Sequence, residues 1–99
     1  MKNNDLQIKE QFSLIKKFVN AREVALRKTK TASMKQLEAI KALHLAFMQH
    51  PPTTIENLYR KVLANMAHFE ALLPSNNSLH AYWRNRLQKT LDRARFMIN

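Results

Sequence analysis

The residues of this sequence most suited to chemistry form a basic and aromatic ladder near its C-terminal end. The ladder consists of Tyr82, Arg86, Lys89, Arg93 and Phe96. Side chains spaced three or four residues apart lie on the same side of a helix, and these five follow that spacing. Guanidinium groups bind phosphate oxygens through paired N–H donors, and an exposed ring can stack on an unpaired base. The ladder therefore predicts a surface that binds single-stranded nucleic acid or a distorted duplex.

A second basic cluster surrounds a short predicted turn. It consists of Arg27, Lys28, Lys30 and Lys35. Ser33, with Gln36 three residues later, has the spacing of a capping box, so a helix is expected to begin there. The free backbone N–H groups and the positive dipole end of that helix would add to the attraction of the four cations. We therefore expect this turn to be the strongest site for one bound anion, held without base-specific contacts.

Both clusters also have an interpretation that needs no ligand. In the ladder, Tyr82 and Phe96 would lie at the edge of the core, and the charges between them would keep the flank of the helix solvated. The cations at the turn would only solvate a loop. A third basic stripe, formed by Lys9, Lys16 and Arg27, lies on the first predicted helix. Charge runs of this kind are usually solubilising, so we expect no ligand there.

Catalytic and metal-binding constellations are missing from the sequence. The seven carboxylates are scattered, and none forms a pair three or four residues apart on a helix. The four histidines lack metal-ligand spacing, and there is no cysteine to supply a thiolate. His44 falls on an apolar face, where a hydrogen-bonded core histidine is expected. We predict no enzyme activity, no catalytic residue, no cofactor and no metal.

Composition sets the class of protein and of partner. With 99 residues, 45% of them hydrophobic, the chain is expected to form one domain over residues 1–99. Lys and Arg number 17 against 7 Asp and Glu, which gives a net charge of +10 and indicates an anionic partner. Glycine is absent, which argues against hairpins and glycine-rich phosphate loops. No stretch is long and apolar enough to span a membrane and no signal peptide is evident, so a cytoplasmic protein is expected.

Apolar periodicity predicts four amphipathic helices, over about residues 5–28, 34–50, 53–74 and 79–98. Pro51 and Pro52 separate the second from the third, and Pro74 begins a polar loop before the fourth. Thr53, with Glu56 three residues later, is expected to cap the third helix. Because the connections are short, the predicted fold is an all-α, single-domain bundle of about four antiparallel helices.

The apolar faces of these helices are expected to meet in one core. The predicted core residues are Ile8, Phe12, Ile15, Val19 and Leu26 in the first helix; Leu37, Ile40, Leu43, Phe47 and Met48 in the second; Ile55, Leu58, Tyr59, Val62, Met66, Phe69 and Leu73 in the third; and Leu79, Trp83, Leu87, Leu91, Ala94 and Ile98 in the fourth. The apolar arc of the first helix is broad and would also suit a homodimer.

Two functional hypotheses follow. The first is a non-enzymatic accessory protein that binds the phosphate backbone of RNA or DNA, with single strands favoured. Few Asn or Gln residues accompany the arginines, so backbone contacts are favoured over base reading. Asn85 and Gln88 are the exceptions, and they are the residues with which a helix-turn-helix would read bases. The second is a protein-interaction module, such as a subunit of a nucleoprotein complex, an adaptor or a phage-type inhibitor, that docks on an acidic partner. Its anchors would be Tyr82, Phe96 and Leu45.

The apolar faces of the helices are expected to pack against one another, which leaves no apolar face free to insert into a membrane. A role at the membrane surface is therefore not favoured. Both remaining hypotheses require the cations to gather into a continuous track once the helices pack.

Overall fold

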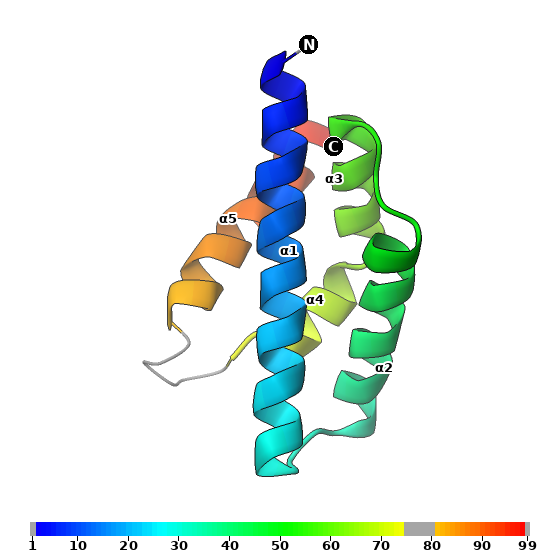
Figure 1. Cartoon of the computed structure of the whole chain (residues 1–99). Helices are drawn as coiled ribbons and strands as arrows, with labels where there is room; N and C mark the ends of the chain where they lie inside the picture. The colour runs from blue at the N-terminus through cyan, green and yellow to red at the C-terminus, as the bar shows by residue number, and fades with distance from the viewer. Residues whose placement is uncertain (1, 75–80, 99) are drawn as a thin grey trace.

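The protein is built from helices alone in the part of the chain that the structure describes (Figure 1). The structure is a computed structural model that describes residues 2–74 and 81–98, and the side chains of residues 6–74 and 81–96. Its helices are α1 (Lys2–Thr29), α2 (Met34–Leu43), α3 (Ile55–Ala64), α4 (Met66–Leu72) and α5 (Ala81–Ile98), with a π-helix, η1 (His44–Gln49), continuing α2. The all-α prediction is confirmed, whereas the predicted count of four is wrong, because five α-helices are present in the described residues.

The turn after α1 shows how a helix ends in a chain without glycine. Lys30 adopts the left-handed conformation, with φ of 56°, which is the position where glycine usually stops a helix. The backbone N–H of Lys30 donates to the carbonyl of Leu26 at 2.9 Å. Three residues later the predicted capping box is confirmed, because Ser33 and Gln36 each accept a hydrogen bond from the backbone N–H of the other.

The second predicted helix has the expected extent but a different ending. Its last turn is the π-helix η1, which ends immediately before His50 and the two prolines. The Lys61 ammonium of α3 donates to the carbonyl of Ala46 at 2.8 Å and also to the carbonyl of His50. A side chain from the next helix therefore satisfies acceptors at the end of η1 that the helix itself cannot satisfy.

The third predicted helix is two helices, which is the main error in the predicted element count. Asn65 ends α3 and starts α4, with φ of −114° and ψ of 20°. Its side-chain amide donates to the carbonyl of Lys61 at 2.9 Å, and the same carbonyl also accepts the backbone N–H of Asn65 at 3.1 Å. The cap at the start of α3 also differs: Thr54, not Thr53, accepts from the backbone N–H of Asn57.

The short helix α4 is held by side chains from two neighbouring helices. Arg22 of α1, only 8% exposed, donates its Nε–H to the carbonyl of Leu72 at 2.7 Å. Gln36 of α2 donates to the carbonyl of Ala71 at 3.2 Å. Burial lowers the pKa of the Arg22 guanidinium, which still carries its charge because its ordinary pKa is very high. The last carbonyls of α4 thus find donors inside the fold.

The buried side chains form one cluster that draws on every helix. Its members are Ile15, Phe18, Val19, Leu26, Ala39, Ile40, Leu43, Phe47, Leu58, Tyr59, Val62, Phe69, Leu72, Leu87, Leu91 and Ala94. Most predicted core positions are confirmed, and Trp83 packs against the cluster while only partly buried. Leu37 is a wrong prediction, since it is 48% exposed. Leu79, the side chain of Ile98 and the loop after Pro74 lie outside the described residues.

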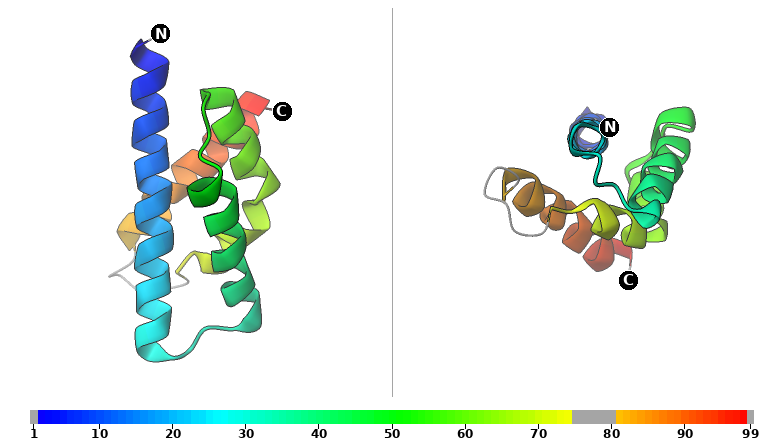
Figure 2. Two further views of the ribbon diagram at one scale, coloured as in Figure 1. Left: turned by 45° about the vertical axis from the view of Figure 1, so that its right-hand side comes forward. Right: turned by 90° about the horizontal axis from the view of Figure 1, so that it is seen from below.

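The longest helix, α1, has different neighbours on its two sides. The chain reverses at the turn after α1, and α2 returns beside it, while α5 crosses behind it (Figure 1). Seen from below, α2 lies to the right of α1, and α5 runs diagonally past it from the left (Figure 2). Among the described helices, none combines the length and apolarity needed to cross a membrane. The antiparallel up-and-down order and the single domain remain predictions.

The left-handed Lys30 yields a stability prediction. A side chain with a Cβ is disfavoured in this conformation by about 1 to 2 kcal/mol, which a glycine avoids at some cost in chain entropy. We expect Lys30→Gly to raise the free energy of unfolding by about 0.5 kcal/mol. Lys30→Val should lower it, because a β-branched side chain tolerates positive φ worst. Urea denaturation measures both values, and a destabilised glycine variant would contradict the role given to this residue.

Candidate nucleic-acid interface

Two adjoining hollows lie between α1 and α5. Their volumes are about 340 and 360 Å³. Both are lined by Gln11, Leu14 and Arg86, and we call the two adjoining hollows together the basic groove. Its walls are α1 and α5, which cross each other (Figure 1). A groove between two rigid helices is a more precise scaffold for a ligand than a loop.

The wall from α5 carries the cations of the predicted ladder. Arg86, Lys89 and Arg93 are all exposed, and all three line the basic groove. Within residues 6–74 and 81–96, no carboxylate forms an ion pair with any of them. The sequence therefore placed these three side chains correctly on one surface, and their charges are available to an external anion.

The wall from α1 adds cations that the sequence did not suggest for this role. Lys9 and Lys17 both line the groove. We expected Lys9 only to solubilise its helix, and Lys17 was not singled out. Glu10 is the one carboxylate among the lining residues. Five cations and one carboxylate thus border the groove, which makes it strongly electropositive.

A polar contact fixes how the two walls meet. Thr90 of α5, only 4% exposed, donates its hydroxyl to the Gln11 side-chain carbonyl of α1 at 2.7 Å. The two residues are 79 positions apart in the chain. Both residues line the basic groove, together with Leu14 and Arg86. The register of the cations across the groove is therefore set by a long-range contact, which helical periodicity alone cannot reveal.

A chain of rings connects the groove to the core. The Phe18 and Trp83 rings lie 6.1 Å apart edge to face, and Trp83 contacts the Tyr82 ring at 5.1 Å. The Arg86 guanidinium lies 5.3 Å from the centre of the Tyr82 ring. Tyr82 is 56% exposed, so it presents a ring beside a cation at the groove, whereas Phe96 is 87% exposed but lies outside the groove lining.

The second predicted cluster lies elsewhere, so the cations divide into two regions and not one track. Arg27 and Lys30 line a separate hollow between α1 and α2, and neither lines the basic groove. Arg27 is paired with Glu23. Lys28 and Lys35 are exposed but line neither hollow. The capping box at Ser33 already uses one N–H of the first turn of α2, which weakens the argument for an anion at that helix end.

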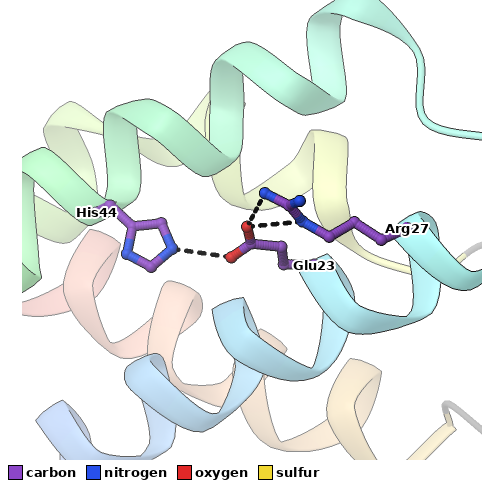
Figure 3. A network of polar contacts seen from close by, with 3 residues as sticks. All are labelled: Glu23, Arg27 and His44. Atoms are coloured by element: carbon purple, nitrogen blue, oxygen red, sulfur yellow. Dashed lines mark hydrogen bonds and ion pairs between the residues drawn. The ribbon is translucent and has the colours of Figure 1, made fainter.

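Glu23 joins α1 to the end of α2 through a polar network (Figure 3). Its carboxylate accepts two bonds from Arg27, at 2.8 and 3.1 Å, and lies 3.1 Å from Nε2 of His44. An ionised carboxylate only accepts, so this nitrogen of His44 carries the proton. The bond from His44, followed by the Arg27 contacts, lowers the pKa of Glu23 against the opposing effect of desolvation. His44 is hydrogen-bonded as expected, but it lies at the edge of the core.

Two further properties of the described side chains concern metal binding and base reading. Within the described residues, no three His, Cys, Asp or Glu side chains come together in a way that could hold a metal ion. Gln88, considered for base reading, donates its amide to Asp92 of its own helix at 3.1 Å.

Comparisons with protein-family models, curated proteins and solved structures find no match.

The lowered pKa of Glu23 yields a pH-dependent stability prediction. A group whose pKa is lower in the folded than in the unfolded chain stabilises the fold above its unfolded value and loses that effect as pH falls. We expect Glu23→Gln to reduce the free energy of unfolding by about 1 kcal/mol near pH 7, with the difference shrinking below about pH 4. Urea denaturation at both pH values measures it.

The matched control is Glu38→Gln. Glu38 is exposed on α2 and forms no ion pair within the described residues. Its replacement should change stability little at either pH. A loss for Glu23→Gln that persists unchanged in acid would contradict the assigned role of the carboxylate.

Proposed function

We propose that this protein binds the phosphate backbone of nucleic acid, with a preference for single strands, and acts by binding without catalysis. The basic groove is the proposed contact surface. The observation that carries the proposal is the set of exposed cations along one wall, Arg86, Lys89 and Arg93, which have no ion pair within the described residues. Lys9 and Lys17 line the basic groove from the other wall.

The arrangement of these cations is unfavourable for the isolated fold, which supports a role in binding. Like charges three and four residues apart on a helix repel by a few tenths of a kcal/mol per pair. The neighbouring Asp92 and Glu70 are both engaged by Arg95, outside the groove lining. A polyanion would relieve the repulsion and release its own counterions on binding, which is the main source of affinity for a phosphate backbone.

Tyr82 supports a preference for single strands. Its ring is exposed beside Arg86 at one end of the groove, and the hollow that it borders has a volume of about 360 Å³. Stacking on a ring requires a base that is not already stacked in a duplex. Phosphates would lie along Arg86, Lys89 and Arg93, and one base would lie against Tyr82.

Charge neutralisation tests the proposal. We expect wild-type protein to bind an oligothymidylate of about 20 nucleotides with a log–log salt slope of about −3, as for about four neutralised phosphates. The triple variant Arg86→Gln, Lys89→Gln, Arg93→Gln should bind about tenfold or more weakly, with a slope near −1, because about three contacts are lost. Fluorescence anisotropy between about 50 and 200 mM salt measures both.

The control variant carries the same change in net charge at the turn. Lys28→Gln, Lys30→Gln, Lys35→Gln removes three positive charges outside the basic groove, so its affinity should stay close to that of wild type. Equal loss in both variants would contradict the groove as the contact surface, since net charge alone would then explain the binding. A flat salt dependence of the wild type would contradict backbone binding itself.

A further inference from the structure

A separate hollow lies between α1 and α2, away from the basic groove. Its volume is about 720 Å³, which falls within the range of small-molecule sites. The packing of α2 explains the space, because α2 contacts α4 far more extensively than it contacts α1. The Glu23–His44 bridge crosses from α1 to the end of α2 within the lining of this hollow (Figure 3).

The floor of this hollow is apolar and reaches the core. Leu26 and Ile40 line it and are each only 7% exposed. Leu37 lines it as well and is 48% exposed, so it offers apolar surface that a ligand could cover. A ligand with an apolar chain would cover Leu37 and contact Leu26 and Ile40 at the floor.

The rim of the hollow is positively charged. Lys30 and Lys41 both line it and are exposed, and neither forms an ion pair with a carboxylate of the described residues. The carboxylate of Glu23 is already bonded to Arg27 and His44, so it leaves these ammonium groups uncompensated. The charge of the rim therefore complements an anionic head group. It disfavours a second copy of this chain, whose net charge is also +10.

We propose that the hollow between α1 and α2 binds a small amphipathic anion, specifically an unbranched medium-chain fatty acid. The alkyl chain lies against Leu26, Leu37 and Ile40. The carboxylate pairs with Lys30 and Lys41 at the rim. This site is independent of the basic groove, because the two share no lining residue and involve different parts of α1, residues 23–27 and residues 9–17.

Titration of full-length protein with decanoate, below the concentration at which decanoate forms micelles, tests this inference. We expect saturable binding by isothermal calorimetry, with amide shifts in a ¹⁵N-labelled sample concentrated at the ends of α1 and α2 that border the hollow. 1-Decanol, which lacks the charge, and acetate, which lacks the chain, should each bind at least about threefold more weakly. Decanol binding as tightly as decanoate, or no saturation by decanoate, would overturn the proposal.

Matched variants locate the site. Lys30→Gln with Lys41→Gln should weaken decanoate binding about tenfold, at about threefold per lost ion pair. Lys28→Gln with Lys35→Gln makes the same charge change outside the hollow and should leave binding within about twofold. Leu37→Ser should also weaken binding, and its exposed position keeps the fold intact, as a thermal melt would show. Equal effects of the two lysine pairs would overturn the site.

The groove variant Arg86→Gln, Lys89→Gln, Arg93→Gln separates this inference from the proposed function. It should bind decanoate as wild type does while binding oligothymidylate weakly. Loss of decanoate binding in this variant would overturn the assignment of the fatty acid to the hollow between α1 and α2.

Discussion

The contact between α1 and α5 is the constraint on which the proposed interface depends. Two interactions define it: the buried hydroxyl of Thr90 donates to Gln11, and Trp83 packs edge to face against Phe18. The first fixes the position of α5 along α1, and the second anchors its N-terminal end to the core. Because the walls are rigid helices, these contacts decide which lysines of α1 face the arginines of α5. A shift of one residue along either helix would rotate its cations by about 100° and disperse the groove.

Carboxylates are distributed in a way that leaves the groove positive. Glu56 pairs with Arg60, and Glu23 pairs with Arg27, each within one helix. Ion pairs at the surface of a protein contribute at most about 1 kcal/mol each to stability. Their effect on the surface potential is larger, because they neutralise regions outside the basic groove while the groove has Glu10 alone among its lining residues. The electrostatic contrast between the faces of the protein thus comes from where the few acidic residues lie.

Helical periodicity predicted the helices and their buried faces well. It did not predict which side chains of different helices lie together. The spacing of Ile15, Val19 and Leu26 is enough to identify the buried face of α1, since burial repeats with the helical turn. The break at Asn65 was missed because the apolar stripe of the third predicted helix continues through it from Val62 to Met66 and Phe69. The groove was half predicted: the ladder of α5 is visible in the sequence, but the contribution of Lys17 follows from a contact between residues 79 positions apart.

The most direct test of the central claim is an NMR titration of ¹⁵N-labelled protein with a short oligothymidylate at low salt. If the basic groove is the contact surface, the amide and arginine side-chain shifts will concentrate on α1 between Lys9 and Lys17 and on α5 between Tyr82 and Arg93. They will reverse when salt is raised. Shifts that instead centre on the turn after α1, or that spread evenly over all helices, would contradict the account.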